Sequence, residues 1–306
     1  MKKIKNLFLL LFCFLFLTGC SSLPGLPSNK DSDVISITGG VTTESQILAS
    51  LASGMIEHYT DYRTSIINNL GTAQIDQQAL LNGDADISAA RYTGTDIITI
   101  LQMDAIKDPE EAFEVSKNEV MARYNQYRFP PYGFDNTFVF LVRKDTAQEY
   151  NLEKVSDLEA IADQVTVGTD RPWITRAGDG YPGFIQEYGF EFDKMLPMQI
   201  GLVYDAVAAD RVDVVLGYST DGRIASNNLV MLEDDKQFFP PYDATMIANQ
   251  SFLDQYPEAK DVLDRLVDTI DTETMQELNY ESDNNLVEPS IVAEQFLEEN
   301  DYFEDQ

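Results

Sequence analysis

The order of strand-like and helix-like segments predicts an α/β fold made of two similar lobes. In the first third of the chain, apolar strand-like segments alternate with segments of helical spacing, which is typical of a mostly parallel sheet covered by helices. In the second half, a helix, an acidic turn and an apolar strand recur, and in both halves a tyrosine follows the strand. Ligands of open α/β sheets bind at that edge, so two such lobes would enclose a cleft. A chance match between short segments is the alternative.

The first lobe begins with a β-branched strand at residues 34–38. After a Gly-Gly turn, Thr and Ser residues suited to a helix N-terminus precede apolar residues at helical spacing from 47 to 56. A second strand is expected at 64–68 and a second helix at 74–81. The third strand is expected within 86–92, and the last of these residues is a tyrosine.

The second copy of this arrangement begins with a helix at 204–209. Acidic residues then lead into a strand at 214–216, and Tyr218 follows it. Two helices near the end of the chain, at 259–270 and 291–297, are expected to return and cover the first lobe.

Two extended segments are predicted to cross between the lobes as hinge strands. One is the apolar strand at 138–142, and the other is the proline-bearing segment at 238–243. Lobe one would then comprise residues 33–140 together with 244–306, and lobe two would comprise residues 143–240.

Residues 1–19 have the features of a lipoprotein signal peptide. Lysines precede an apolar run at 7–17 that is too short to span a bilayer comfortably, and the run ends in Leu-Thr-Gly-Cys. We therefore expect acylation of Cys20 to anchor the chain at the extracytoplasmic face of the cell membrane. An uncleaved anchor with an unmodified cysteine is the alternative. Residues 20–32, rich in Ser, Pro and Gly, would form a flexible tether.

The composition excludes several classes of function. The net charge of −31 would repel nucleic acid. His58 is the single histidine, and both cysteines lie within the first twenty residues, so the folded part has no multi-histidine metal site, thiol nucleophile or cysteine zinc site. No phosphate-binding loop is present. We therefore expect a protein without a cofactor or metal that is not an enzyme.

Four aromatic residues from separate parts of the chain are candidates for one binding site. Tyr92, Phe138, Tyr218 and Tyr242 each lie beside a predicted strand end or crossing segment. Ring faces attract cations, and a trimethylammonium group donates no hydrogen bond and is cheap to desolvate, so each desolvated contact is worth about 2 kcal/mol. For any one ring taken alone, packing in the core is the usual role.

Six sequence blocks carry a family resemblance that covers the chain from about residue 34 to 303. They are RYTGTD at 91–96, FDNTF at 134–138, IGLVYDAV at 200–207, YSTDGRI at 218–224, FPPYD at 239–243 and IDTETMQELNY at 270–280. Together they resemble the glycine betaine/carnitine/choline-binding lipoproteins of ABC osmoprotectant importers. The resemblance implies a type II periplasmic-binding-protein fold, in which two α/β lobes joined by two hinge strands close on the ligand. It also implies a monomer that captures a quaternary-ammonium osmolyte and delivers it to an ABC permease and its ATPase.

The resemblance also assigns the site residues. It implies a cage tyrosine from lobe one at Tyr92, one from lobe two at Tyr218 and one at the hinge at Tyr242. Phe138 stands where relatives commonly have the fourth tyrosine, and Thr95 matches a polar position near the carboxylate end of the ligand.

Two departures from the family pattern bear on selectivity. Phe138 keeps the attraction for a cation but lacks a hydroxyl group. In the first loop, Gly40 stands where many relatives have a glutamine that meets the carboxylate, which leaves more room and one donor fewer. We expect this change to favour a bulkier ligand, or one without a carboxylate.

Two other functions remain open. An extracellular lipoprotein hydrolase could act on a glycan through a carboxylate pair, but no pair of acids stands out as buried and no nucleophile motif is present. A receptor that senses another cation on the same fold would differ mainly in its partner.

Overall fold

The computed structural model describes residues 34–176 and 178–303. The predicted signal peptide at 1–19, the predicted tether at 20–32 and the predicted lipidation of Cys20 lie outside these residues. Within the described ranges, every helix is too short or too polar to cross a membrane.

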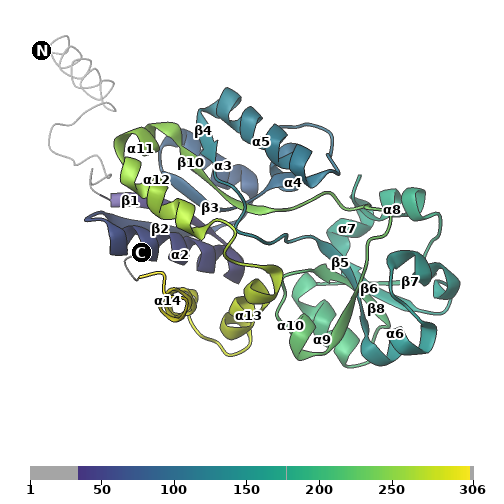
Figure 1. The fold of residues 1–306 in the computed structure, drawn as a ribbon. Coiled ribbons are helices and arrows are strands. Elements are labelled where there is room, and N and C mark those ends of the chain that lie inside the picture. The colour runs from purple at the N-terminus through teal and green to yellow at the C-terminus, as the bar shows by residue number, and fades with distance from the viewer. Residues whose placement is uncertain (1–33, 177, 304–306) are drawn as a thin grey trace, which may run out of the picture. The chain divides into compact units, whose positions relative to one another are not determined.

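The first sheet has five strands, and its order differs from the order of the chain (Figure 1). From edge to edge they are β2 (Arg63–Leu70), β1 (Val34–Gly40), β3 (Ile87–Tyr92), β10 (Ala244–Asn249) and β4 (Gln126–Arg128). β1 and β3 are parallel, whereas β10 is antiparallel to both of its neighbours. The accompanying helices are α2 (Thr43–Tyr59), α3 (Ala73–Asn82), α4 (Thr93–Thr95), η1 (Asp96–Ile100), α5 (Pro109–Tyr124), α11 (Gln250–Gln255), α12 (Pro257–Leu263), η4 (Asp264–Leu266), α13 (Thr272–Asp283) and α14 (Pro289–Glu299).

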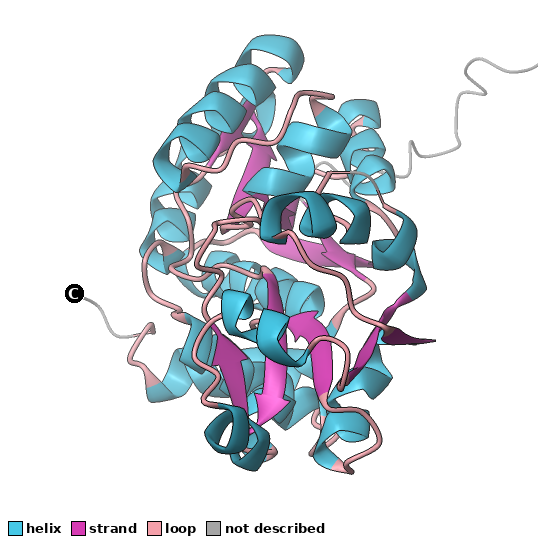
Figure 2. Ribbon diagram, turned by 90° about the vertical axis from the view of Figure 1, so that its right-hand side faces the viewer, coloured by secondary structure: helices cyan, strands magenta, loops and turns pink. Residues whose placement is uncertain are grey.

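The second sheet also has five strands. In order they are β7 (Lys194–Met198), β6 (Thr166–Asp170), β8 (Val214–Tyr218), β5 (Phe138–Arg143) and β9 (Leu229–Leu232). β6 is parallel to β7 and β8, whereas β5 is antiparallel to β8 and β9. The accompanying helices are α6 (Lys144–Tyr150), η2 (Val155–Ile161), α7 (Arg171–Thr175), α8 (Tyr181–Tyr188), η3 (Ile200–Leu202), α9 (Val203–Ala208) and α10 (Arg223–Ser226). Figure 2 shows the strands as two groups, each with helices around it.

The α/β fold is confirmed, and the sheets are mixed rather than wholly parallel. Each sheet is mixed because one of its inner strands, β10 in the first sheet and β5 in the second, runs antiparallel to both neighbours. The chain enters each of these strands after crossing from the other sheet, and so arrives in the reverse direction.

The two crossing segments, 129–137 and 238–243, run beside each other. The backbone N–H of Asn136 donates to the carbonyl of Tyr242 at 3.2 Å. Residues 138–142, which the sequence analysis assigned to a crossing strand, instead belong to β5 inside the second sheet. The first crossing therefore comes before β5. The limits given above for the two lobes remain a prediction.

Burial explains why α2 forms where the sequence predicts it. The hydroxyl of Thr42 accepts from the backbone N–H of Ser45 at 3.2 Å and caps the helix. Ile47, Leu51 and Met55 recur on one face and are fully buried. α14 packs against α2, as Figure 1 shows, so the end of the chain does cover the first sheet.

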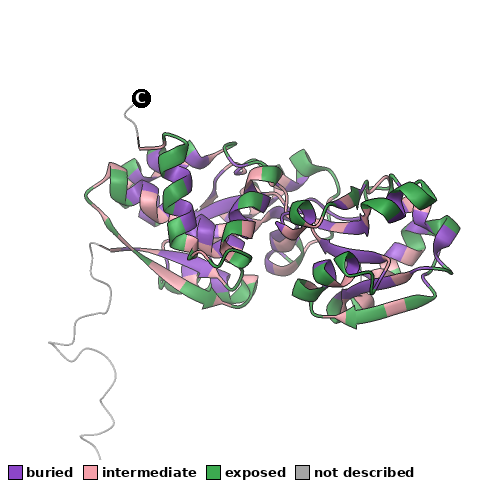
Figure 3. Ribbon diagram, turned by 90° about the horizontal axis from the view of Figure 1, so that it is seen from below, coloured by how far each residue is buried: buried purple, intermediate pink, exposed green. Residues whose placement is uncertain are grey.

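The helix predicted at 259–270 is shorter than expected. It is formed by α12 and η4, and beyond Leu266 the backbone is extended at Val267 and left-handed at Asp268, with φ of 56°. These conformations end a helix. In Figure 3 most strands are buried, apart from the edge strands β2 and β7, and the outer faces of the helices are exposed. The buried apolar residues form two clusters on each sheet, one on each face.

Candidate functional site

One cavity is lined by all five site residues that the sequence analysis selected. It has a volume of about 430 Å³ and receives residues from both sheets and from the crossing segments. The five residues are Tyr92 at the end of β3, Thr95 in α4, Phe138 at the start of β5, Tyr218 at the end of β8 and Tyr242 in the second crossing segment. The structure therefore brings these residues together, while their role in binding remains a prediction.

Phe138 lies at the centre of the aromatic cluster. It is the direct cross-strand partner of Tyr218, and the two ring centroids are 5.1 Å apart. The ring of Tyr242 stands nearly perpendicular to Phe138, at 80° and 6.4 Å. These geometries are the edge-on and tilted arrangements that aromatic rings prefer, so the rings support one another as walls of the cavity.

The hydroxyl group of Tyr92 points away from the ring cluster toward a buried carboxylate. It donates to Oε1 of Glu44 at 2.6 Å, and Nδ2 of Asn136 donates to the same oxygen at 2.8 Å. Burial, followed by the neighbouring Glu44 carboxylate, raises the pKa of Tyr92 well above its usual value. The phenol therefore stays protonated and donates to Glu44.

Tyr242 is held in a similar way from the second lobe. Its hydroxyl group donates to Oδ2 of Asp179 at 2.7 Å. Burial, followed by the Asp179 charge, raises the pKa of Tyr242. The indole of the fully buried Trp173 donates to the backbone carbonyl of Asp179 at 2.8 Å, which anchors the loop that carries this carboxylate.

Arg176 lines the same cavity, and the sequence analysis did not select it. Its guanidinium carbon lies 4.9 Å from the ring centroid of Phe138, and its Nε lies 3.1 Å from Oδ1 of Asp179. The side chain is 40% exposed. It follows a short helix, α7, and no spacing in the sequence distinguishes it from the neighbouring exposed Arg171. Its position provides a cation beside the aromatic wall.

Thr95 lies directly before a π-helical turn. The hydroxyl of Thr99 donates to the Thr95 carbonyl at 2.7 Å, and the backbone N–H of Leu101 reaches the carbonyl of Asp96 at 2.8 Å, which is the spacing of a π-helical turn. π-helical turns are rare and occur often at functional sites. Thr99 and Asp96 line the same cavity as Thr95.

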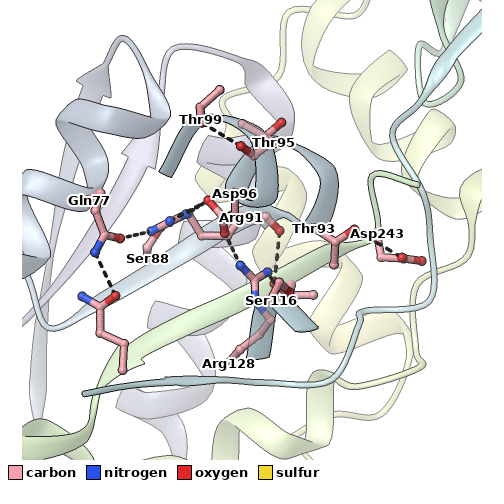
Figure 4. Close-up of polar contacts among 12 residues, drawn as sticks. Gln77, Ser88, Arg91, Thr93, Thr95, Asp96, Thr99, Ser116, Arg128 and Asp243 are labelled. Atoms are coloured by element: carbon pink, nitrogen blue, oxygen red, sulfur yellow. Dashed lines mark hydrogen bonds and ion pairs between the residues drawn. The ribbon is translucent and has the colours of Figure 1, made fainter. Parts of the chain in front are cut away.

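A buried ionic network fixes this turn, as Figure 4 shows. Asp96 is fully buried and accepts from Nε and Nη2 of Arg91 at 3.0 and 2.6 Å, and also from Nη2 of Arg128. Arg91 further donates to Gln77 at 3.0 Å, and Arg128 donates to Thr245 at 2.6 Å. The network joins β3, β4, β10 and α3 behind the turn that carries Thr95.

Gly40 lines the cavity, and the close approach of Ser45 gives a second reason, besides room for a ligand, for a glycine at this position. A Cβ atom at this position would lie 2.6 Å from Oγ of Ser45 and 3.1 Å from its Cβ. Oγ of Ser45 is itself held at 2.7 Å by the carbonyl of Thr42, next to the start of α2. Glycine is therefore required by the close approach of Ser45, and the selectivity expected from this position remains a prediction.

The described residues contain no group of three or more His, Cys, Asp or Glu side chains that could hold a metal ion. His58 stacks on Phe303 with ring centroids 4.3 Å apart, and it is not among the residues that line the cavity.

The chain is similar to known transport proteins over most of its length. The model of the substrate binding domain of the ABC-type glycine betaine transport system matches residues 33–299. The carnitine transport binding protein OpuCC of Listeria monocytogenes is 50% identical over 305 residues, which cover 99% of this chain and 98% of that protein. A solved structure described as a glycine betaine/carnitine/choline ABC transporter has a TM-score of 0.85 at 47% identity, covering 88% of this chain and 100% of that chain.

A third relative differs in architecture. The ergothioneine transport permease/ergothioneine binding protein EgtU of Helicobacter pylori is 30% identical over 299 residues, which cover 97% of this chain and 53% of that protein. All three relatives are transport proteins, so the hydrolase alternative finds no support. The family resemblance found in the sequence is confirmed, and the chain belongs to the family of substrate-binding domains of ABC-type glycine betaine transport systems.

Proposed function

We propose that this protein captures a quaternary-ammonium osmolyte, such as carnitine, glycine betaine or choline, in the cavity between its two sheets and delivers it to an ABC permease. The observation that carries the proposal is the set of four rings, Tyr92, Phe138, Tyr218 and Tyr242, around one cavity of about 430 Å³. Cavities of about 300 to 1,000 Å³ are typical of small-molecule sites.

The chemistry of the walls suits a permanent cation. The hydroxyl groups of Tyr92 and Tyr242 are both engaged by carboxylates, which leaves the ring faces to meet a ligand. A trimethylammonium group needs no hydrogen-bond acceptor and gains about 2 kcal/mol from each desolvated ring face. The guanidinium group of Arg176 lies over the Phe138 ring, so this ring already binds one cation, which supports a site for a cationic ligand.

The opposite end of the ligand is assigned to the polar part of the cavity. The cavity is lined by the guanidinium group of Arg176, which lies beside Phe138, and by Thr95, which carries a hydroxyl group. A ligand that carries a carboxylate would draw the guanidinium group away from Phe138 and free that ring for the trimethylammonium group. We therefore place carnitine ahead of choline, because carnitine carries a carboxylate and also has the bulk that the prediction for Gly40 requires. The relative that is 50% identical to this chain is a carnitine transport binding protein, which supports the same order.

The proposal includes closure of the lobes and attachment to the membrane. A ligand that contacts rings from both sheets stabilises the closed state, and the permease recognises that state. The lobe limits of 33–140 with 244–306 and of 143–240, the monomeric state, the tether at 20–32 and the lipid on Cys20 are parts of this proposal.

Calorimetry on the mature chain, residues 20–306, made without the signal peptide, tests the proposal. The titrants are carnitine, glycine betaine, choline and, as a control without a trimethylammonium group, proline. We expect saturable binding of at least one trimethylammonium compound and none of proline. A folded sample that binds none of the three overturns the proposal. Mass spectrometry of the membrane fraction tests separately whether Cys20 carries acyl groups.

A further inference from the structure

A buried carboxylate stands directly behind one of the ring walls. Glu44, in the first turn of α2, is 4% exposed and is not among the residues that line the cavity. It accepts three hydrogen bonds, from the Tyr92 hydroxyl at 2.6 Å, from Nδ2 of Asn136 at 2.8 Å and from Nδ2 of Asn279 at 3.3 Å. Two of these donors are amide nitrogens that can only donate, so the set matches an ionised carboxylate.

Glu44 has no ion-pair partner in the part of the chain that the structure describes. Asp179, behind Tyr242, differs because its other oxygen pairs with Arg176 at 3.1 Å. Among the described residues, three hydrogen bonds reach the Glu44 carboxylate, and it lies at the N-terminal end of α2, which favours anions. Its field therefore extends through the Tyr92 ring toward the cavity.

The physical consequence depends on the charge of what enters the cavity. A phenol that donates to a carboxylate shifts electron density into its ring, and the negative ring face attracts a cation more strongly. The field of the carboxylate adds to this attraction, because it acts across buried groups where screening is weak. Neither effect changes the dispersion and apolar contacts made by an uncharged molecule of the same shape.

We propose that Glu44 is a specificity-determining residue that acts through the hydroxyl group of Tyr92 and makes this wall select a permanent cation over a neutral molecule of the same shape. The proposal rests on the proposed function. Because Glu44 does not touch the cavity, it is a positioning residue for Tyr92. The raised pKa of Tyr92 is consistent with this role, because the proton remains on the phenol.

A purely structural role is the competing explanation. Asn279 joins Glu44 to the second lobe, since its Nδ2 also donates to the carbonyl of Thr220 at 2.9 Å. Gln276, on the same helix, donates to the carbonyl of Ser219 at 2.6 Å. Loss of Glu44 could thus loosen the packing of α13, and the test must separate this effect from a change in the Tyr92 ring.

The test compares each cationic ligand with its carbon isostere, in which a tert-butyl group replaces the trimethylammonium group. Calorimetry on the full mature chain measures both ligands with Glu44→Gln, Tyr92→Phe and the double variant. We expect Glu44→Gln to weaken binding of choline or glycine betaine roughly fivefold to tenfold and to change binding of the isostere less than about twofold. In the Tyr92→Phe background the same substitution should have a smaller effect on cation binding, because only the direct field of the carboxylate remains to be lost. Equal losses for both ligands, or full additivity in the double variant, overturn the proposal.

Asn279→Ala is the matched control, because it removes a contact of Glu44 without touching Tyr92. We expect a lower melting temperature and an unchanged ratio of affinities for cation and isostere. A ratio that falls as far as in Glu44→Gln means that the role is structural and overturns the proposal. If Glu44→Gln does not fold, the affinities of Tyr92→Phe for the cation and its isostere decide the test. A larger loss for the cation supports the proposal, and equal losses for the two ligands contradict it. A wild-type chain that binds no trimethylammonium compound defeats the proposed function itself, whereas intact binding in Glu44→Gln defeats only this inference.

Discussion

Phe138 and Tyr218 are direct cross-strand partners, and their ring centroids lie 5.1 Å apart. The pair lies where two inner strands of the second sheet meet the cavity, at the start of β5 and the end of β8. The antiparallel register of β5 and β8 sets this pair, because side chains along a strand alternate between the two faces. A slip of one residue would turn one of the rings to the opposite face. The wall of the cavity that the second lobe contributes is therefore a property of the sheet register.

The ring of Tyr218 should account for a large part of the affinity. We expect Tyr218→Ala to weaken binding of a trimethylammonium ligand about thirtyfold, which corresponds to about 2 kcal/mol for one desolvated ring face. Tyr218→Phe keeps the face and should stay within about threefold of the wild type. Calorimetry measures both variants. Wild-type affinity in Tyr218→Ala would remove this residue from the site.

Arg176 should distinguish ligands by their carboxylate. Its guanidinium group sits over Phe138, so we expect Arg176→Ala to weaken carnitine and glycine betaine about tenfold or more and to leave choline unchanged or tighter. Competition binding with the three ligands measures the change. Arg171→Ala, at an exposed position on α7, is the matched control and should change none of them. A uniform loss in Arg176→Ala would contradict a role at the carboxylate end.

The carboxyl group of Asp135 makes stability depend on pH. Burial, followed by the neighbouring charge of Asp243, raises the pKa of Asp135 to about 7, although the Tyr242 N–H group donates to its Oδ1 at 3.1 Å and opposes the shift. The folded state therefore holds a proton that the unfolded state loses near pH 4, so the contribution of Asp135 to stability falls as pH rises from about 4 to about 7 and does not change further above that range. We expect Asp135→Asn to reduce this fall and to stabilise the protein at pH 8 by up to about 4 kcal/mol.

Urea unfolding of both proteins at pH 5 and pH 8 measures this effect. Asp163→Asn, at an exposed turn, is the control and should follow the wild-type pH profile. A parallel profile for Asp135→Asn would show that Asp135 is already ionised at pH 5 in the folded state.

Gly40 should be intolerant of a side chain because of Ser45. A Cβ atom would lie 2.6 Å from Oγ of Ser45, so we expect Gly40→Ala to cost about 1–3 kcal/mol. Ser45→Ala removes the colliding oxygen, and the double variant should be more stable than the sum of the single changes predicts. Thermal unfolding of the three variants checks this coupling. Strict additivity would show that Ser45 is not what excludes a side chain.

Asp96 should be essential for the structure behind Thr95. Asp96→Asn leaves Arg91 and Arg128 without their shared carboxylate in a fully buried place, and we expect a loss of about 3–5 kcal/mol. The exposed pair of Arg123 and Glu119 provides the contrast, and Glu119→Gln should cost less than about 0.5 kcal/mol. Urea unfolding compares the two. Similar small losses in both variants would mean that the buried network contributes little.

The sequence predicts local structure well where burial is periodic. The spacing of apolar residues at 47–56 locates α2, because that spacing records which face of the helix is buried. The runs at 34–38 and 64–68 coincide with β1 and β2, although β2 contains no buried residue. The four rings and Thr95 could be selected from strand ends and from the family resemblance, and all five line one cavity.

The direction of β10 and β5 in their sheets could not be read from the sequence. It depends on the path of the chain between the sheets, and an apolar strand has the same residue pattern in either direction. The same limit caused the error at 138–142, because a crossing strand and an inner strand are equally apolar.

The contacts that tune the rings depend entirely on tertiary packing. Tyr92 meets Glu44 across 48 residues of chain, and Tyr242 meets Asp179 across 63. The residues that flank an acidic residue in the sequence do not show whether its carboxylate will face solvent or a buried phenol. The residues that flank Arg176 likewise do not show that its guanidinium group lies beside Phe138. The aromatic residues that line the cavity can thus be predicted from the sequence. The charged groups of Glu44, Asp179 and Arg176 come next to these rings only when distant segments of the chain pack together.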